Sequence, residues 1–414
     1  MNEIKHTDIL IVGGGSAGVA AAVAASSRGQ HVTLLERNSF LGGKATAAEV
    51  GTICGLYEYS RNPASTYIVK GFAREFAERL KERSGSTPLN NNEGLHYLPY
   101  QVEAFGEICN EYLAQKGVTV LLNATVENIT IRSGVIESVS VTYNNSNIIF
   151  QVKAVVDCSG DSVISKAANM SVIKDTQYQA AAQVFSMQGV TEENEARLGM
   201  IMMKALRAGI EANEIPAYYD RVYIVQGSLK NGHVNLKLGI PVPVTYEKGN
   251  VEEIQRTARE FVQGVSDYLV QHVAAYKNAV TSHIASEAGI RIGERTMGTY
   301  LLTEDDVLNC RKFPDAIANG SWPVEIWEQD RRVKMHYFPL DNCYQVPAGC
   351  LQAAAISNLY MAGRNISATR MAIASARVMG ICLQTGFAAG CMAFAKAAGV
   401  PREDILEYLQ NLQL

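Results

Sequence analysis

A glycine-rich turn between an apolar strand and an apolar helix restricts the fold of this chain more than any other feature. Ile9-Leu10-Ile11-Val12 has the pattern of a buried strand, and it runs directly into Gly13-x-Gly15-x-x-Gly18. An Ala- and Val-rich helical stretch follows to Arg28, and a second apolar strand then ends at Glu36. This order is typical of the βαβ unit of a parallel α/β sheet.

The three glycines have separate physical roles. Gly13 permits the tight turn, Gly15 lets a pyrophosphate approach the backbone, and Gly18 lets the helix pack closely on the strand. The first turn of the helix, with Ser16 and Ala17, presents backbone amides and the positive end of the helix dipole to phosphate charge. The spacing therefore predicts a dinucleotide-binding turn.

The acidic residue at the end of the second strand makes this prediction more specific. Glu36 lies where a carboxylate accepts hydrogen bonds from an adenosine ribose, about 20 residues beyond the turn. A glycine turn alone can merely close a strand-helix junction, but strand, helix, second strand and acid are all in register here. Dinucleotide binding is favoured, and the fingerprint serves NAD and FAD alike.

The rest of the first part of the chain continues the α/β pattern. Apolar periodicity and turn residues divide it into short elements. The expected elements are helices at 65–83 and 101–116, a buried strand at 118–122, a small antiparallel meander laid on the main sheet at 124–151, and a return to that sheet at 154–157.

The pattern of strand-like and helical runs changes between about residues 180 and 335, which indicates an inserted lobe. The chain there has β-like runs at 222–225 and 234–244, and then a long helical pattern at 251–272. It returns to the first lobe through a short strand at 359–362 and an Ala- and Gly-rich helix. We therefore expect a discontinuous nucleotide-binding domain over 1–180 and 337–414, and an inserted substrate or cap domain over 181–336.

Four segments spread over nearly the whole chain resemble those of the FAD-dependent oxidoreductase family among the glutathione-reductase-like flavoproteins. They are Glu36 followed after five residues by Gly42-Gly43, Val155 to Asp161, Arg295 to Asp306, and Ala362-Gly363-Arg364-Asn365-Ile366-Ser367-Ala368-Thr369-Arg370. The resemblance implies FAD as the cofactor. It also implies an α/β fold in which a Rossmann-type FAD-binding domain, a parallel sheet plus a β-meander, carries an inserted mixed α+β substrate domain.

The cofactor contacts that we expect extend beyond the first turn. Asp161 follows a strand and a tight turn beside the cofactor, although it could equally cap a helix. Gly363 permits close passage of the cofactor, and the helix after it would aim its first amides at the flavin, unless both are only packing devices. The resemblance implies backbone contacts to adenine near Val126. The full expected set beyond Gly13, Gly15, Ser16, Ala17, Gly18 and Glu36 is Arg37, Gly42, Gly43, Lys44, Thr46, Val126, Ser159, Gly160, Asp161, Gly363, Arg364 and Ala374.

Candidate catalytic residues are polar or cationic side chains near the junctions of the inserted lobe. His336 has an unperturbed pKa suited to proton transfer, although such a histidine is more often structural. Arg370 would either clamp an anionic substrate or pair locally. Arg295 matches the family segment and would serve either the reaction or the domain junction.

The favoured function is transfer of a hydride between a small organic substrate and flavin N5, by a dehydrogenase or an oxidase. Electrons would then pass to oxygen, a quinone or a protein carrier, and the sequence specifies neither this acceptor nor an oligomeric state. One alternative is an NAD(P)H-dependent flavin monooxygenase or reductase, which the lack of a second GxGxxG disfavours. The other alternative is a non-catalytic flavin-binding protein.

Composition excludes several other classes. A net charge of -4 provides no basic field for nucleic acid. The eight cysteines form no CxxC pair, so we expect reduced thiols and no metal site. The first eight residues lack the apolar core of a signal peptide, which leads us to expect a cytoplasmic protein.

One apolar stretch invites comparison with a membrane span. Residues 378–395 are uncharged and contain Gly386-x-x-x-Gly390, a spacing that lets membrane helices approach closely. Small and polar residues dilute the stretch, and Arg377 and Lys396 flank it closely. We expect a helix buried against the sheet and no association with a membrane.

Overall fold

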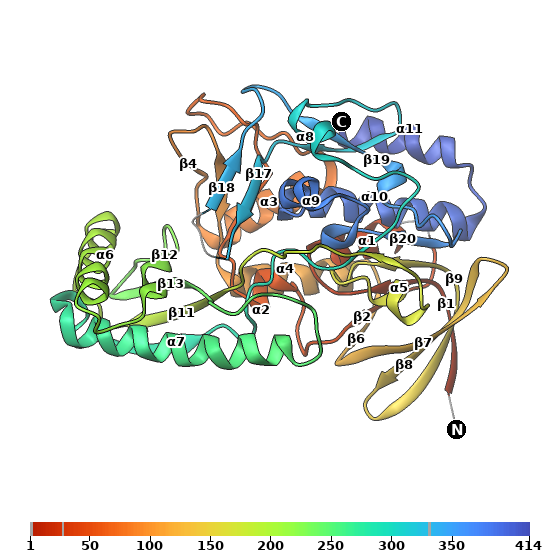
Figure 1. Cartoon of the computed structure of the whole chain (residues 1–414). Coiled ribbons are helices and arrows are strands. Elements are labelled where there is room, and N and C mark those ends of the chain that lie inside the picture. The colour runs from red at the N-terminus through yellow and green to blue at the C-terminus, as the bar shows by residue number, and fades with distance from the viewer. Residues whose placement is uncertain (1–2, 27–28, 330–332) are drawn as a thin grey trace.

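The computed structural model describes residues 3–26, 29–329 and 333–414, and it contains a main α/β body from which a smaller sheet and two helices project (Figure 1). Arg28, the expected end of the first helix, lies outside the described residues. The α/β class predicted from the sequence is confirmed by the parallel pairings of the main sheet.

The main sheet has seven strands in the order β6-β2-β1-β9-β8-β7, with β20 also paired to β9. Its strands are β1 (Glu3–Val12), β2 (Val32–Glu36), β6 (Thr119–Leu122), β7 (Ala124–Arg132), β8 (Val135–Tyr143), β9 (Ser146–Asp157) and β20 (Leu359–Met361). The pairs β6-β2, β2-β1, β1-β9 and β9-β20 are parallel. The ends of β1, β2, β9 and β20 therefore meet at one edge of the sheet, where ligands of open α/β sheets bind.

The meander continues the main sheet and is not laid upon it, which corrects the expectation from the sequence. β9 is one unbroken strand that pairs with β1 from Glu3↔Ile148 to Val12↔Asp157, while its first part pairs antiparallel with β8. The ten residues of β1 are long enough to keep this ladder going past the expected break near residue 152. Figure 1 shows β7 and β8 extending from the sheet near the N-terminus.

Helix α10 (Met379–Ala398) packs against α1 (Ser16–Ser26) through glycines. A Cβ at Gly386 would lie 2.2 Å from the carbonyl oxygen of Ala17, and a Cβ at Gly390 would lie 2.2 Å from that of Ala21. By length and hydropathy α10 could span a membrane, but 78% of its apolar window is buried inside the protein. It is the central helix of the core.

A second pair of helices packs beside α1 and α10. The helix expected at 65–83 begins later, as α3 (Gly71–Ser84), because Tyr67 forms a β-bridge with Tyr57 and the backbone there is extended. The helix expected at 101–116 is α4 (Val102–Gln115). The other elements of this region are α2 (Lys44–Ala47), the three-stranded sheet of β3 (Thr52–Cys54), β5 (His96–Pro99) and β4 (Leu89–Asn90), α5 (Val163–Ala167) and β10 (Val172–Ile173).

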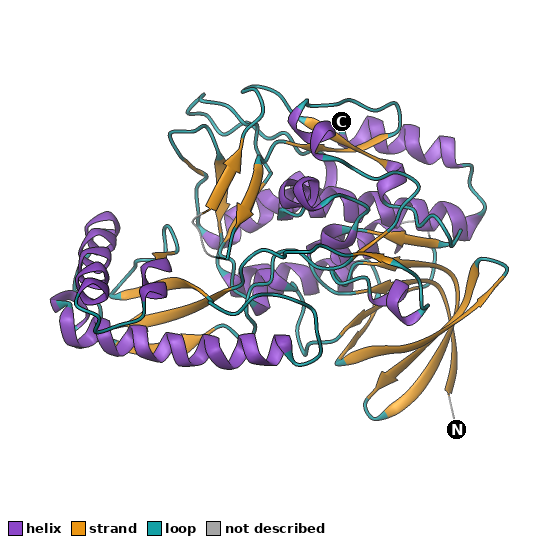
Figure 2. Ribbon diagram, viewed as in Figure 1, coloured by secondary structure: helices purple, strands orange, loops and turns teal. Residues whose placement is uncertain are grey.

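The projecting part is a four-stranded antiparallel sheet with its own apolar core. Figure 2 shows its strands lying along α7, with α6 beside them. Its elements are β11 (Ala182–Gln188), α6 (Glu195–Glu211), η1 (Ala217–Arg221), β12 (Val222–Ile224), β13 (His233–Gly239), α7 (Asn250–His272), η2 (Ala274–Tyr276) and β14 (Val280–Ile284), with sheet order β12-β13-β11-β14. Its core joins residues between Phe185 and Ala279.

The chain after the projecting sheet packs with the main body. Buried residues from Ile292 to Ile326 belong to the main core. Two antiparallel pairs of strands, β16-β19 and β17-β18, and several helices complete it. The elements of this part are β15 (Arg295–Thr296), α8 (Glu304–Leu308), β16 (Ala316–Gly320), β17 (Val324–Trp327), β18 (Val333–His336), β19 (Tyr344–Pro347), η3 (Ala348–Cys350), η4 (Gly363–Asn365), α9 (Arg370–Ala376) and α11 (Arg402–Gln413). The division of the chain into domains stays a proposal, and this packing favours a second boundary near residue 290 in place of 336.

Candidate cofactor and substrate site

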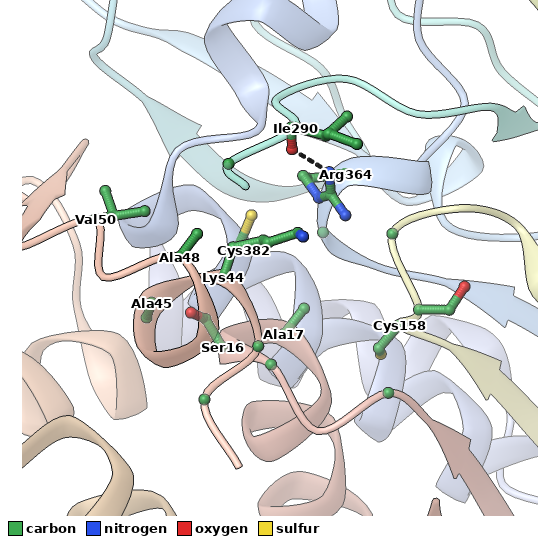
Figure 3. Close-up of a pocket in the computed structure, with 18 of the residues that line it drawn as sticks. Ser16, Ala17, Lys44, Ala45, Ala48, Val50, Cys158, Ile290, Arg364 and Cys382 are labelled. Carbon is green, nitrogen blue, oxygen red and sulfur yellow. Dashed lines mark hydrogen bonds between the residues drawn. The ribbon is translucent and has the colours of Figure 1, made fainter. Parts of the chain in front are cut away.

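A cavity of about 510 Å³ lies between the main sheet and the projecting sheet. Residues at the ends of β1, β2 and β9 line it, as do residues of the loop before α2 and of the segment before α10. Ala182, Val184 and Lys237 of β11 and β13 line it from the projecting sheet. Figure 3 shows part of this lining, with Ser16, Ala17 and Lys44 on one side and Ile290 and Arg364 on another.

The first glycine turn is built as its spacing predicts. Gly13 has φ +102°, and a Cβ there would lie 2.6 Å from the carbonyl oxygen of Cys158. Gly15 faces the cavity, and its missing Cβ would have no protein atom closer than 3.6 Å. Gly18 does not line the cavity, because it faces the strand: a Cβ there would lie 1.7 Å from the carbonyl oxygen of Gly13.

The second glycine pair lies directly against the first turn. The amide of Gly42 donates to the carbonyl oxygen of Gly14 at 2.9 Å, and Gly42 forms a parallel bridge with Gly15. Gly43 faces the cavity, whereas the Thr46 hydroxyl turns inward and donates to the carbonyl oxygens of Leu41 and Gly43. Thr46 therefore fixes the loop and does not line the cavity.

Glu36 is a buried carboxylate at the cavity. Its side chain accepts hydrogen bonds from the backbone amides of Gly14 at 2.7 Å and Asn38 at 2.9 Å. Burial raises the pKa of its carboxyl group, and the two amide donors oppose that change. The carboxylate thus has a fixed position, and each oxygen keeps a lone pair for a further donor.

An ion-pair cluster joins the loop after β2 to the segment after β14. Glu287 pairs with Lys44 and, at 3.1 Å, with Arg37, and it accepts a hydrogen bond from the Asn38 amide group at 3.0 Å. Burial opposes ionisation of Glu287, but these cations and hydrogen bonds outweigh it and lower its pKa to about 2. The carboxylate is therefore charged throughout the physiological range.

The turn after β9 lies directly beside an arginine that lines the cavity. Asp161 accepts a hydrogen bond from the Tyr246 hydroxyl at 3.2 Å and lies 3.9 Å from the Arg364 guanidinium. Arg364 donates to the carbonyl oxygen of Ile290 at 2.6 Å (Figure 3). Gly160 has φ +78°, a conformation that favours glycine, and a Cβ there would lie 2.5 Å from the end of the Arg364 side chain.

Of the helices that follow Gly363, α10 begins at the cavity. Directly after Gly363 the chain forms only the short η4, and the next helix, α9, has its first turn capped by the Thr369 side chain. Within the described part of the chain no side chain caps the first turn of α10, and Val378 and Met379 at that end line the cavity. We expected the helix directly after Gly363 to point its positive end at the cavity. That position is held instead by α10, which comes later in the chain.

The far end of the cavity carries a group of charged side chains that we name the cationic end, defined as Lys237, Arg291, Glu325, Trp327 and Arg377. Glu325 lies 3.5 Å from Arg377 and accepts a hydrogen bond from the Trp327 indole at 3.0 Å. Lys237 and Arg291 lie over the Trp327 ring, at 4.5 Å and 4.3 Å from its centroid. Three cations thus share one carboxylate.

Burial and mutual repulsion perturb these groups. Burial and the charge of Arg291 lower the pKa of Lys237 to about 8. Burial and the charge of Arg377 lower the pKa of Arg291 to about 9. Burial opposes ionisation of Glu325, but the surrounding cations outweigh it and hold the pKa of its carboxyl group below the usual value.

Most of the residues expected to contact a cofactor line this one cavity. Those that line it are Gly13, Gly15, Ser16, Ala17, Glu36, Arg37, Gly42, Gly43, Lys44, Val126, Ser159, Gly160, Asp161, Gly363 and Arg364. Gly18 and Thr46 support the turns from behind. Ala374 is fully buried within α9 and does not line the cavity.

The three candidate catalytic residues do not line the cavity. Arg295 is fully buried and bonded to Asp175 at 2.6 Å and 2.8 Å and to the carbonyl oxygen of Ala368. His336 lies in β18, paired with Val324 of β17. Arg370 begins α9, and its Nε has no hydrogen-bond partner among the described residues.

The cationic end was missed because its members come from four distant segments. Lys237 lies on β13, Arg291 on the loop after β14, Glu325 and Trp327 on β17, and Arg377 just before α10. The alternation of apolar and polar residues along β13 is visible in the sequence, and it places Lys237 between two leucines. No local pattern in the sequence predicted that this lysine would lie beside the other four residues of the cationic end.

Comparison with known proteins identifies a matching family. A family model described as FAD dependent oxidoreductase matches residues 8–413. The carotenoid 3,4-desaturase of Haloarcula japonica is 31% identical over 121 residues, 28% of this chain and 23% of the relative. The digeranylgeranylglycerophospholipid reductase 2 of Methanosphaera stadtmanae is 25% identical over 201 residues, 47% of this chain and 50% of the relative. The matched regions thus cover half or less of these curated relatives.

Solved structures share the fold. The OxyS anhydrotetracycline hydroxylase of Streptomyces rimosus superposes with a TM-score of 0.51 at 12% identity, over 98% of this chain and 65% of that chain. At this identity the likeness concerns the fold alone. It agrees with a Rossmann-type dinucleotide-binding fold, as the glycine turn and the parallel strands predict.

Proposed function

The chain belongs to the family of FAD-dependent oxidoreductases, and we propose that it transfers a hydride between a small organic substrate and the flavin. We also propose that it belongs among the glutathione-reductase-like members, which its four family-like segments resemble. One observation carries the functional proposal. A single cavity is lined at one end by the dinucleotide-binding turn and at the other by the cationic end.

The residues at the first end fit FAD. Gly15 leaves open the space that a Cβ would fill beside the backbone, as a bound pyrophosphate requires. Glu36 is fixed by two amides and can accept from ribose hydroxyls. Lys44 and the uncapped first turn of α10 supply positive charge. When bound, FAD supplies the group that accepts or donates the hydride.

Lys237 is the residue that we propose for proton exchange with the substrate. Its pKa of about 8 lets the amino group give or take a proton near neutral pH. Glu325 holds Trp327 and Arg377 in place and stays ionised. Cys54 also lines the cavity, but burial raises its pKa to about 12, so it stays a thiol and does not act as a nucleophile.

Anaerobic reduction of the bound flavin tests this function. The purified FAD-loaded protein is mixed with a library of metabolites, and the loss of the visible flavin absorbance is followed. We expect at least one small metabolite to bleach the flavin faster than NADPH does. Replacement of Lys237 by Met should slow that reduction by tenfold or more at pH 7, while Lys204→Met, on the exposed face of α6, should not.

Two other outcomes would replace the proposal. Rapid bleaching by NADPH, followed by a peroxyflavin spectrum when oxygen is admitted, would identify a monooxygenase. Failure of every donor, including NADPH, to reduce a flavin that dithionite reduces would identify a non-catalytic flavin-binding protein.

A further inference from the structure

We infer that the substrate is a small organic anion, held at the cationic end through its oxyanion group by Arg291 and Arg377. This inference rests on the proposed function, because it names the class of substrate for the same cavity.

The charges of the cationic end do not balance within the protein. Lys237, Arg291 and Arg377 carry three positive charges when protonated, and Glu325 carries one negative charge. Glu325 is also shared, because its oxygens accept from the indoles of Trp327 at 3.0 Å and Trp322 at 3.3 Å as well as facing Arg377. A net positive charge of about two therefore faces a partly enclosed cavity, where salt screens charges less than at the protein surface.

The Trp327 ring positions two of these cations without neutralising them. Lys237 and Arg291 both lie within 4.5 Å of its centroid. Such contacts attract each cation to the face of the ring and leave its full charge in place. The indole N–H is itself bonded to Glu325, which fixes the orientation of the ring.

Hydrogen-bond donors are left over at the same place. The Nε of Arg377 is buried and has no acceptor among the described residues. Its Nη2 faces Glu325 and the Gln179 side-chain oxygen, both at 3.5 Å, which is long for a hydrogen bond. A guanidinium binds planar oxyanions in a two-point geometry, so an entering oxyanion would satisfy donors that the protein leaves free.

The neighbouring helix adds to the same field. Arg377 directly precedes Val378, the residue before the first turn of α10, and both line the cavity. The N-terminus of a long helix carries about half a positive charge. The lowered pKa values of Lys237 and Arg291 agree with this field, since a bound anion would relieve the repulsion that lowers them.

The rest of the lining indicates a small molecule with an apolar part. Val50, Ala182, Val184 and Met379 line the cavity together with the cationic end. An apolar carbon skeleton would bury against these side chains, while the oxyanion would fix its orientation. The arginines thereby decide which end of the substrate enters first.

Binding of simple anions to the FAD-loaded protein tests the inference without turnover. The probes are propionate, succinate and methyl phosphate, with propionamide and succinamide as neutral counterparts. Binding is read from the perturbed visible flavin spectrum and from the thermal stability of the complex. We expect the anions to bind at least tenfold more tightly than the amides, and the difference between carboxylates and phosphate will show which oxyanion is preferred.

Matched variants assign the binding to the two arginines. Arg377→Gln and Arg291→Gln should each weaken anion binding by tenfold or more at unchanged FAD content, and Arg377→Lys should recover part of it. Arg256→Gln, on the exposed face of α7, is the control and should bind as the native protein does. Equal binding of amides and anions, or anion binding that both Gln variants retain, would overturn the inference.

The two proposals fail in different ways. If anions bind through the arginines but no metabolite reduces the flavin, the hydride-transfer function is wrong and the anion site stands. If a neutral metabolite reduces the flavin and anions leave its spectrum unchanged, the anion site is wrong and the function stands.

Discussion

At the scale of single residues, two glycines of the same turn have opposite surroundings. Gly15 faces the open cavity, whereas Gly18 faces the carbonyl oxygen of Gly13. An added methyl group at the first position would meet the cofactor, and at the second it would meet the protein. The two substitutions therefore separate cofactor binding from folding.

We expect Gly15→Ala to lower FAD affinity by tenfold or more while the melting temperature of the FAD-free protein changes by less than about 1 °C. Gly18→Ala should instead lower that melting temperature strongly, because its Cβ would lie 1.7 Å from a backbone oxygen. FAD titration and thermal unfolding of the two FAD-free variants check this. A stable Gly18→Ala protein with normal FAD affinity would contradict the packing.

Lys237 gives a prediction for the pH dependence of stability. Its pKa is lowered from 10.5 to about 8 in the folded state, so its charge destabilises the folded protein below about pH 8 and that cost disappears as the pH rises to 10.5. Lys237→Met should therefore raise the melting temperature of the FAD-free protein by a few degrees at pH 7, with a gain that shrinks toward pH 10.5. The groups facing Lys237 are Arg291, Glu325, Cys54 and Arg377, together with Tyr223 of the paired strand.

Comparison of native and variant melting temperatures at several pH values removes the contributions of those other groups. A gain that stayed constant from pH 7 to pH 10.5 would show that the ammonium charge is not the cause. Bound anion should reduce the gain at pH 7, because the native protein, with three cations at the cationic end, should bind it more tightly than the variant with two.

The residues of the dinucleotide turn could be predicted from the sequence because each one depends on its near neighbours. Gly13, Gly15 and Glu36 all lie in one βαβ unit, where spacing alone sets their positions. The cationic end could not be predicted, because Lys237 and Arg377 meet only through tertiary packing. For the same reason Arg295, chosen from a family-like segment, lies in a buried ion pair with Asp175 away from the cavity.

At the scale of elements, the stretch that resembled a membrane span is the helix on which the dinucleotide fold packs. The small residues of α10 let its backbone approach that of α1. The same Gly-x-x-x-Gly spacing therefore serves close packing inside a protein core. The apolar composition predicted a buried helix. Its flanking charges and its polar residues indicated that it lies in a protein core and not in a membrane.

We expect Gly390→Ala to destabilise the protein by about 1–3 kcal/mol, because its Cβ would lie 2.2 Å from the carbonyl oxygen of Ala21. Gly199→Ala in α6 is the matched control. Its Cβ would meet no atom closer than 3.7 Å, and alanine favours helix by about 1 kcal/mol, so this variant should be neutral or more stable. Denaturant unfolding of both variants checks the difference, and equal stabilities would contradict it.

The sequence pattern predicted some strands of the main sheet but not how they join. The alternation in residues 124–151 predicted the hairpin of β7 and β8, and the apolar run at 154–157 predicted a core strand. That the end of the meander, residues 146–151, and the run at 154–157 belong to one strand, β9, depends on the full length of β1 as its partner. Pairing across more than a hundred residues leaves no local signal at the junction.

At the scale of the whole molecule, Glu287 joins the segment after the projecting sheet to the cofactor end of the cavity. It bonds to Lys44, Arg37 and Asn38, all of which follow β2. These contacts tie the two segments together beside the cavity, which Glu287, Arg37, Asn38 and Lys44 all line. The Glu287 carboxylate remains charged down to about pH 2, so mild acid does not break its ion pairs.

We expect Glu287→Gln to weaken this connection and to raise the rate of FAD dissociation several-fold at neutral pH. The physical reason is that the substitution removes one charge of a half-buried ion pair and leaves the Lys44 ammonium without its carboxylate partner. FAD release measured by flavin fluorescence checks the rate. Glu252→Gln, in the exposed first turn of α7, is the control and should leave it unchanged. A slower or equal rate in Glu287→Gln would show that Glu287 does not retain the cofactor.

The late position of β20 and α10 along the chain has a consequence for biosynthesis. Gly363, Arg364 and the start of α10 line the cavity that the N-terminal turn begins. A growing chain on the ribosome thus presents Gly13 and Gly15 long before their counterparts exist. We expect that the flavin is acquired only after synthesis has passed α10, and that nascent chains stalled before residue 359 retain none.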